Sequence, residues 1–474
     1  MAPTGPELLL DIDRSRPGPP LRARVEAALR EAIRDGRLRA GDRLPATRSL
    51  AAELRCSRWV IVEAYAQLAA EGWVEGRAGS GTRVRARGAG GGGDDRGGAA
   101  AQTASWRAPA YDFSVGLPDL VGFPRTAWLG AMQRAVRTAP AAELGHPDPS
   151  GASALRRELA AYLGRVRGVA AEAEHVIVTH GFTHGFGLIC HALRERGHER
   201  IALEDPGFPL LHAFARRAGL EPVAAAVDDR GLRVDALRAT GARAVVVAPA
   251  HHFPMGHVLA AERRAELLAW AHDADGLVVE DDYDAEFRYD RRPVGALQAL
   301  APQRVIYAGS ASKTLAPALR LGWLVCPPRW QRRIANVRWG VDLGVGVLDQ
   351  LALADLIARG TLDRHLRRTR QRYAARRRAL LAAVERELRG ASVEGVAAGL
   401  HALVHLPAGC DEAAVVARAL ERGVAVVGLA AFHAAGPAPG PGLVLGYAQL
   451  TEPAIAEGIR RIGDAVRATS GINL

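Results

Sequence analysis

The chain contains a single lysine, Lys313, within the segment Gly-Ser-Ala-Ser-Lys-Thr at residues 309–314, and the other 61 of its 62 basic residues (62 minus 1) are arginines. An arginine can bind phosphate or pair with a carboxylate as well as a lysine can, but its guanidinium stays protonated in proteins. Lysine alone offers a nucleophilic amine, which condenses with an aldehyde to form a Schiff base when its surroundings lower its pKa. Lys313 is therefore predicted to hold pyridoxal phosphate, a cofactor that proteins bind through this bond.

Other residues suited to such a cofactor follow predicted strands at their C-terminal ends, where open α/β sheets bind their ligands. Phe182 and Thr183 open a helix after the first strand, so backbone amides and the Thr183 hydroxyl there can hold a phosphate. Phe208 follows the second strand and can stack on a flat ring, although a phenylalanine in this position alone is more often part of a core. Arg320, seven residues after Lys313, suits a bidentate contact to a phosphate.

The acidic run Glu-Asp-Asp-Tyr-Asp at residues 280–284 follows a further predicted strand. Crowded carboxylates are costly unless a cation accompanies one of them, and a protonated pyridine nitrogen is such a cation. An aspartate beside that nitrogen keeps the ring an electron sink. A metal site is the alternative interpretation of this run, but no second histidine or carboxylate cluster stands at a ligand spacing, so no metal is expected.

The elements that must position these residues alternate between strands and helices. Apolar, β-rich runs occur at residues 175–179, 200–203, 244–248, 277–280, 305–308 and 321–325. Strands that alternate with helical stretches predict a mostly parallel, doubly wound α/β sheet. From residue 360 a long arginine-rich helix leads into a smaller α/β segment that ends in a helix over residues 452–466.

The composition is that of a globular protein with more than one domain. The 474 residues are 49% hydrophobic and 24% charged, and no apolar run of about 18 residues predicts a membrane span. The first 20 residues lack the apolar stretch of a signal peptide, so we expect a cytoplasmic protein. The net charge of +11 fits a polyanionic partner. The four cysteines stand far apart without metal-ligand spacing and are predicted to be reduced and structural: Cys56, Cys190, Cys326 and Cys410.

A glycine-rich stretch at residues 88–101 can neither pack nor hold a helix and predicts a flexible linker. Before it, helices are expected over residues 21–35, 47–54 and 57–71, followed by a hairpin whose runs 73–75 and 82–85 flank a Gly-Ser-Gly tip.

The second and third of these helices make a helix-turn-helix, in which Ser57 is a candidate N-cap and Arg58 points outward toward a DNA major groove. Residues 37–87 contain ten arginines and five acidic residues, a net charge of about +5, and such clustering suits phosphate contacts. A solvated helical bundle with incidental arginines is the alternative.

Residues 21–84 resemble the GntR-type winged helix, through the run Gly-Arg-Leu-x-x-Gly-x-x-Leu-Pro at 36–45, the Ser-Arg pair at 57–58 and the Glu-Gly ahead of the wing. The resemblance implies that four residues touch double-stranded DNA: Arg48, Ser57, Arg58 and Gly81. Arg58 is the best candidate for a contact to a base edge. Val60 stands where the family usually has a threonine, and the bulky Trp59 precedes it, so the family's operator preference does not carry over.

Residues 111–474 are similar to the fold type I pyridoxal phosphate family, which includes the class I aminotransferases. The resemblance implies Lys313 as the residue of the internal aldimine, Asp281 on the pyridine nitrogen, Tyr283 on the ring hydroxyl and Phe208 stacked on the ring. The residues that would hold the phosphate are Arg320, Ser310, Phe182 and Thr183.

Together the two parts resemble the MocR branch of bacterial transcriptional regulators. That resemblance implies a winged-helix DNA-binding domain at 1–87, a linker at 88–109 and an aminotransferase-like domain with a smaller C-terminal α/β domain at 110–474. Such proteins are usually head-to-tail homodimers, which present two DNA-binding heads to a repeated operator.

In the aminotransferase-like part, four positions depart from the family pattern. Val444 stands where aminotransferases carry the arginine that binds a substrate carboxylate, and Leu210 stands where members that sense γ-aminobutyrate carry another arginine, which disfavours that effector. His146 replaces a tyrosine in the segment 145–149, and His252 replaces a common glutamine.

The leading hypothesis is a DNA-binding regulator that senses pyridoxal phosphate or an amino compound as its small-molecule effector. An aminotransferase with an appended DNA-binding domain is the first alternative, and a DNA-binding repressor whose second domain binds no cofactor is the other. Missing carboxylate recognition argues against efficient turnover, because substrate orientation supplies much of an enzyme's rate. We therefore expect the aminotransferase-like domain to sense an effector.

Overall fold

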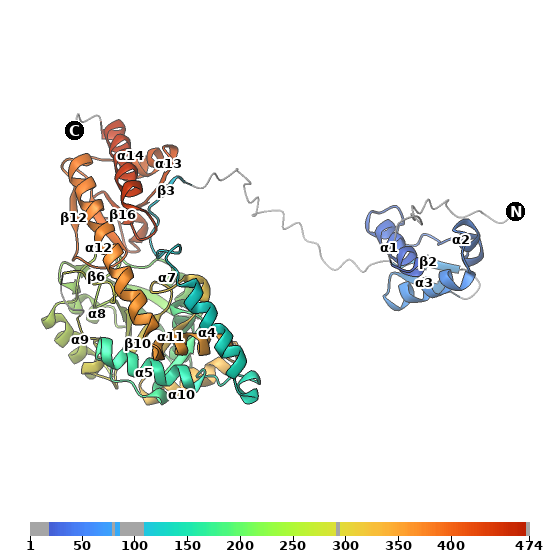
Figure 1. Cartoon of the computed structure of the whole chain (residues 1–474), viewed down its shortest axis with the longest axis horizontal. Helices are drawn as coiled ribbons and strands as arrows, with labels where there is room; N and C mark the ends of the chain where they lie inside the picture. Colours follow the sequence, from blue (N-terminus) through green and yellow to red (C-terminus); the bar gives the residue numbers. More distant parts are fainter. Residues whose placement is uncertain (1–18, 78–80, 86–108, 291–293, 471–474) are drawn as a thin grey trace. The chain divides into compact units, whose positions relative to one another are not determined.

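The computed structural model describes residues 19–77, 81–85, 109–290 and 294–470. The chain divides into two compact units, Met1–Trp106 and Arg107–Leu474 (Figure 1). Most of the predicted linker, residues 88–108, and the Gly79-Ser80 part of the predicted hairpin tip lie outside the described residues. Among the described helices, none combines the length and apolar character that a membrane span requires.

The first unit is the predicted winged helix. It contains helices α1 (Leu21–Arg34), α2 (Thr47–Glu53) and α3 (Arg58–Ala70), followed by strands β1 (Val74–Arg77) and β2 (Gly81–Val84). The two strands pair antiparallel, with Val74 opposite Val84, which confirms the predicted hairpin. Apolar residues of all three helices and both strands form one small core, and Leu29, Leu50 and Ile61 are fully buried in it.

The second unit is built around an eight-stranded sheet with the strand order β4-β11-β10-β9-β8-β5-β6-β7. The strands are β4 (Val176–Thr179), β5 (Arg200–Asp205), β6 (Glu221–Asp228), β7 (Gly231–Leu232), β8 (Ala244–Val247), β9 (Leu277–Asp282), β10 (Val305–Ser310) and β11 (Gly322–Val325). The strands from β10 through β9, β8 and β5 to β6 pair in parallel, and β11 and β7 pair antiparallel with their neighbours. The predicted doubly wound α/β fold is confirmed.

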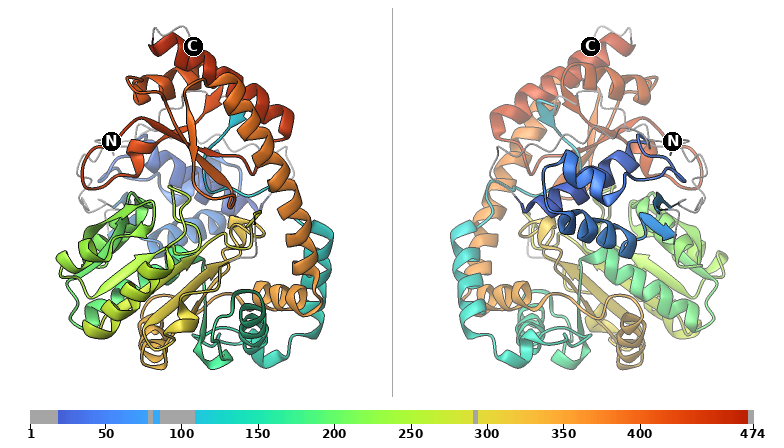
Figure 2. Two further views of the ribbon diagram at one scale, coloured as in Figure 1. Left: turned by 90° about the vertical axis from the view of Figure 1, so that its left-hand side faces the viewer. Right: turned by 90° about the vertical axis from the view of Figure 1, so that its right-hand side faces the viewer.

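Helices cover both faces of this sheet (Figure 2). Successive residues of one strand belong to different cores: Ile201 packs with α6, α7 and α10, whereas Ala202 packs with α8 and α9. Strands buried on both faces therefore appear in the sequence as continuous apolar runs. The helices of this larger part of the unit are α4 (Arg125–Thr138), α5 (Ser153–Arg167), α6 (Phe182–Glu195), α7 (Leu210–Arg217), α8 (Val234–Ala239), α9 (Ala261–Asp273), α10 (Pro328–Trp339) and α11 (Val347–Ala358).

The smaller C-terminal part contains a four-stranded antiparallel sheet with the order β12-β13-β16-β15. Its elements are α12 (Thr361–Glu387), β12 (Ser392–Glu394), β13 (His401–His405), α13 (Glu412–Glu421), β14 (Val424–Ala425), β15 (Val427–Gly428), β16 (Gly442–Gly446) and α14 (Glu452–Ser470). In Figure 1, α12 runs from the region of α11 to α14 and so connects the two parts. The first strand of the unit, β3 (Tyr111–Asp112), pairs with β14 and ties the start of the unit to this smaller part.

Candidate functional site

A cavity of about 330 Å³ lies where β4, β5, β9 and β10 end. Its lining includes all eight residues for which the sequence predicts a cofactor contact: Phe182, Thr183, Phe208, Asp281, Tyr283, Ser310, Lys313 and Arg320. They reach it from the start of α6, the turn after β5, the end of β9 with the residue that follows it, and the segment from the end of β10 to β11. Residues separated by up to 138 positions (320 minus 182) therefore share one site, because parallel strands bring their carboxyl ends to one edge of the sheet.

Lys313 lies in the turn after β10, and its amine donates a hydrogen bond to the backbone carbonyl of Gly116. Burial lowers the pKa of this amine, and the negative charges of Asp284 and Asp281 oppose that shift in part. A lowered pKa increases the fraction of the unprotonated, nucleophilic form. The one lysine of the chain is therefore placed in the environment that covalent attachment of an aldehyde requires.

Three of the four carboxylates in the acidic run 280–284 have partners among the protein's own groups. Glu280 accepts hydrogen bonds from two backbone amides, Asp282 forms a buried ion pair with Arg167 at 2.6 Å, and Asp284 contacts His251 at 2.9 Å. The sequence suggested a cofactor nitrogen as the cation for this run, but the chain's own Arg167 from α5 neutralises one of its acids.

The fourth carboxylate, that of Asp281, makes no hydrogen bond or ion pair with any residue that the structure describes. Burial raises its pKa to about 8, the charges of Asp282 and Asp284 add to this effect, and Lys313 opposes it. An unpaired carboxyl at the wall of a cavity fits a ligand that brings a cationic or hydrogen-bonding nitrogen to this point. This is the fit that a pyridine ring requires.

The shifted Asp281 carboxyl makes the stability of the cofactor-free protein depend on pH. Its pKa of about 8 lies above the value near 3.9 of an unfolded chain. The protonated carboxyl therefore stabilises the fold fully below about pH 4, and this contribution is lost as the pH rises through 8, by up to about 1.4 kcal/mol per pH unit.

We expect Asp281→Asn to remove this contribution to the pH dependence of stability. The thermal midpoint of the variant should therefore fall less than that of the wild type between about pH 5 and 8. Asp229→Asn, at an exposed position, is the control and should follow the wild type. If the thermal midpoints of the wild type and Asp281→Asn depended on pH in the same way, the raised pKa of Asp281 would be contradicted.

The opposite end of the cavity is suited to an anion. Helix α6 begins at Phe182 without a side-chain cap, so the amides of its first turn are free to bind an anion. Arg320 has a left-handed backbone (φ 51°), and its Nη2 donates to the carbonyl of His180 at 2.6 Å. A Cβ at Gly181 would lie 3.3 Å from Nη1 of Arg320, so glycine there allows the guanidinium to approach the helix. Amides, guanidinium and the nearby hydroxyls of Thr183 and Ser310 together suit a phosphate.

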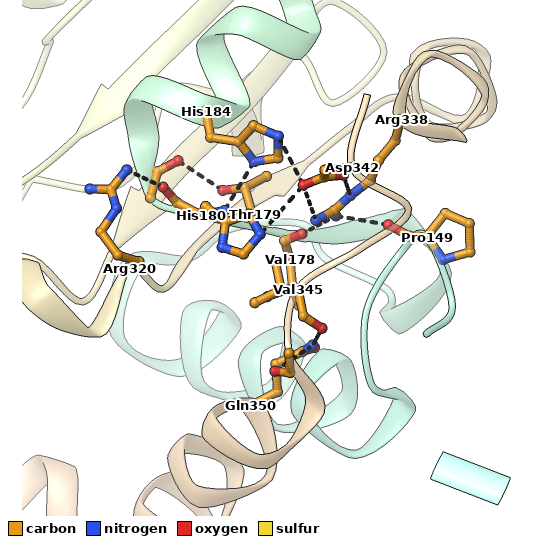
Figure 3. Close-up of polar contacts among 12 residues, drawn as sticks. Pro149, Val178, Thr179, His180, His184, Arg320, Arg338, Asp342, Val345 and Gln350 are labelled. Carbon is orange, nitrogen blue, oxygen red and sulfur yellow. Dashed lines mark hydrogen bonds and ion pairs between the residues drawn. The ribbon is translucent and has the colours of Figure 1, made fainter. Parts of the chain in front are cut away.

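A polar network behind Arg320 holds this end of the site in place (Figure 3). Asp342 Oδ2 lies 3.4 Å from His180 Nε2 and 3.3 Å from His184 Nε2, and its other oxygen accepts from Arg338 Nε at 2.9 Å. Burial, with the charge of Arg338 as a smaller cause, lowers the pKa of His184 to about 4, so its ring is neutral and Nδ1 accepts from the His180 amide at 3.0 Å. The sequence did not single out this network, whose members come from the turn between β4 and α6, from α6, from α10 and from the segment that follows α10.

Most of the remaining cavity wall is aromatic or apolar, and the polar side chains of Ser312 and His401 complete it. Phe253 packs edge-on against Phe208 and Tyr283, with ring centroids 6.2 and 6.4 Å apart, and Val115 and Leu400 also line the space. Phe253 follows the predicted strand at residues 244–248, but the sequence analysis assigned it no role. The packing of the segments that follow β5, β8 and β9 places this ring at the cavity.

The departures from the family pattern have clear structural positions. Val444 is fully buried in an apolar cluster with Leu403, Leu429 and Phe432, and Leu210 is an exposed residue at the start of α7. Lys313 and Arg320 are the only lysine or arginine side chains that line the cavity within the described part of the chain. A substrate carboxylate would therefore lack a cationic partner of its own.

Neither of the two histidine departures lines the cavity. His146 is exposed in its segment. His252 is buried, with Nε2 3.7 Å from Glu204, and burial lowers its pKa to about 3.

In the winged helix the four residues predicted to touch DNA are accessible: Arg48, Ser57, Arg58 and Gly81. Arg58 stands at the start of α3, and its Nε donates to the Thr47 hydroxyl at 3.3 Å. Ser57 occupies the N-cap position of α3, as predicted, although its side chain accepts no capping hydrogen bond there. Trp59, next to Arg58, is 65% exposed.

Comparisons with known proteins match both units. Residues 21–84 match the family of bacterial regulatory proteins called gntR, and residues 111–462 match the aminotransferase class I and II family. The HTH-type pyridoxine biosynthesis transcriptional regulator PdxR of Corynebacterium glutamicum is 33% identical over 92% of this chain and 94% of its own length. The probable rhizopine catabolism regulatory protein MocR of Rhizobium meliloti is 31% identical over 97% of this chain and 95% of its own length.

Among solved structures, the kynurenine aminotransferase of Pyrococcus horikoshii superimposes with a TM-score of 0.69 at 26% identity, over 77% of this chain and 92% of its own. The α-aminoadipate aminotransferase of Thermus thermophilus gives 0.68 at 26% identity, over 76% and 93%. The enzymes thus correspond to about three quarters of the chain, whereas the two regulators span nearly all of it.

Proposed function

We infer the function from one premise: this chain belongs to the MocR branch of GntR-type transcriptional regulators, which join a winged helix to an aminotransferase-like domain. The protein is a DNA-binding transcriptional regulator. We propose that pyridoxal phosphate, held at Lys313, is both its cofactor and the signal that changes its affinity for DNA.

The observation that carries this proposal is the distribution of charge in the cavity. The cofactor combines a phosphate, an aldehyde and a pyridine nitrogen on one flat ring, and the cavity offers a partner for each. Arg320, with the first turn of α6, would bind the phosphate, Lys313 the aldehyde carbon and Asp281 the nitrogen. Phe208 would stack on the ring. When bound, the cofactor supplies an aldehyde that condenses with primary amines and a ring that withdraws electrons.

A sensor explains the cavity better than an aminotransferase does. Amino acid substrates carry a carboxylate, and the position at which aminotransferases bind it is occupied by the buried Val444. The cofactor itself needs no such contact. The name of the Corynebacterium relative, a regulator of pyridoxine biosynthesis, also supports the vitamer as effector.

We further propose that the protein acts as a homodimer. A twofold pair would present two α3 helices to a repeated operator. Cofactor binding would shift the equilibrium between two arrangements of this dimer that differ in DNA affinity.

A DNA titration tests the function directly. The probe is a duplex from the region upstream of the chain's own gene, titrated at stated salt with and without pyridoxal phosphate. We expect the affinity to change by at least about fivefold when the cofactor is added, the lower end of typical allosteric coupling.

Two controls separate the alternatives. Sustained multiple turnover with amino donors would favour the aminotransferase, and no visible absorbance after reconstitution with the cofactor would favour a regulator that does not bind it.

A further inference from the structure

Behind Tyr283 lies a buried polar cluster to which the sequence assigned no role. His251 follows β8, Asp284 follows β9 and His401 begins β13, and these side chains are at most 5% exposed. Potential ligand atoms of the three lie within 4.8 Å of one another, which makes them the one group in the described ranges that could hold a metal ion. The hydrogen bonds within the cluster indicate a different use.

One nitrogen of His251 faces two partners. Its Nδ1 lies 2.9 and 3.1 Å from the two oxygens of Asp284 and 3.1 Å from the hydroxyl oxygen of Tyr283. A ring nitrogen carries either a hydrogen or a lone pair, and an ionised carboxylate only accepts hydrogen bonds. The contact to Asp284 therefore requires a hydrogen on Nδ1.

This hydrogen determines how Tyr283 bonds. Because Nδ1 has no free lone pair, the tyrosine hydroxyl cannot donate to His251, and its oxygen can only accept from the N–H. The hydroxyl proton is consequently directed away from His251. Burial raises the pKa of Tyr283 well above its ordinary value, and the charges of Asp284, Asp281 and Glu204 and a weaker hydrogen-bond contribution from Asp284 add to this shift. The hydroxyl therefore keeps its proton and can donate it.

The surroundings keep the ring of His251 in this position. His401 packs against it with ring centroids 5.1 Å apart, and His401 Nε2 lies 3.1 Å from the Pro254 carbonyl, which holds His401 in turn. On the other side, a Cβ at Gly399 would lie 2.6 Å from the Asp284 carboxylate, so only glycine leaves room for the pair. A metal ion bound through Nδ1 of His251 would need this nitrogen without its hydrogen, whereas Nδ1 already contacts the Asp284 carboxylate.

We propose that His251 and Asp284 are positioning residues that fix Tyr283 as a hydrogen-bond donor toward the ring oxygen of the cofactor. This inference rests on the proposed binding of pyridoxal phosphate at Lys313. A donor at the ring oxygen stabilises its anionic form and therefore disfavours the protonated holoprotein chromophore. The pair thus sets the pH at which the bound cofactor changes colour, although neither of its members lines the cavity.

The test is a pH titration of the visible absorption of the holoprotein. We expect Tyr283→Phe to raise the midpoint by about one pH unit, the size of a single charge-assisted hydrogen bond. His251→Leu should also raise the midpoint when Tyr283 is present. In a double variant with Tyr283→Phe, the His251→Leu change should have little further effect. His251→Asn, which keeps an N–H donor, should restore most of the wild-type midpoint and also shows that the fold tolerates a change here.

A second histidine–carboxylate pair provides the control. His257 Nε2 lies 2.7 Å from Glu394, neither residue lines the cavity, and His257→Leu should titrate like the wild type. Equal shifts from His251→Leu with and without Tyr283→Phe, or a stoichiometric metal ion in the purified protein that Asp284→Asn removes, would overturn the inference. A colourless wild type would instead refute the proposed function, so the two failures are distinguishable.

Discussion

Replacing Lys313 with alanine is expected to abolish both the visible absorption of the reconstituted protein and its DNA response to pyridoxal phosphate. Lys313 is the only lysine of the chain, and its amine is the one side-chain group able to form the covalent bond. The DNA affinity of the variant should equal that of the cofactor-free wild type whether or not the cofactor is present. Absorption spectroscopy and the DNA titration measure the two effects on the same sample.

Lys313→Arg is the matched control for this experiment. It keeps a cation of similar reach but offers no amine that condenses with an aldehyde, so it should be as colourless as the alanine variant. Borohydride reduction of the wild-type holoprotein followed by mass spectrometry should place the cofactor mass on the peptide that contains Lys313. A coloured alanine variant, or a label on another peptide, would refute the assignment.

Arg58→Ala should produce the second large effect, a loss of DNA affinity of about 10- to 100-fold at constant salt, which corresponds to about 1–3 kcal/mol. Arg58 is exposed at the start of α3, the end of a recognition helix that contacts base edges. Removing a base contact should also relax the preference at one operator position, which binding to a set of single-substituted duplexes would measure.

Arg48→Ala separates a base contact from a phosphate contact. If Arg48 contacts the DNA backbone, its variant weakens binding to all duplexes alike. The slope of log affinity against log salt concentration should then fall by about one, the release of one counterion. A uniform loss for Arg58→Ala as well, with unchanged base preference, would show that Arg58 also contacts only phosphate.

Much of the fold and of the candidate site follows from local patterns. Six strands of the large sheet were predicted as apolar runs, because strands covered by helices on both faces need apolar residues at every position. The eight residues of the cavity wall were predicted because they follow strands or helix starts, and such positions meet at one edge of a parallel sheet. The kind of residue at each strand end was sufficient to indicate the chemistry.

The elements that were not predicted lack such a pattern. β6 lies near the edge of the sheet, next to the short β7, and has mostly half-buried residues, so its alanine-rich sequence does not stand out. β3 and β14 are strands of two residues whose pairing joins positions more than 300 apart in the chain (424 minus 111 is 313). Elements this short form because a distant partner is present, and no local preference indicates them.

The sequence by itself determined which amine is available for covalent attachment, because a single lysine leaves no choice. Only the tertiary structure decided which groups surround that amine and how their protons are shared. The carbonyl that binds Lys313 lies 197 residues away, and Arg167 rather than a ligand neutralises Asp282. His251 meets Asp284 and Tyr283 from the segment that follows β8. Protonation depends on burial and on charges within a few ångströms, and the packing of distant segments sets both.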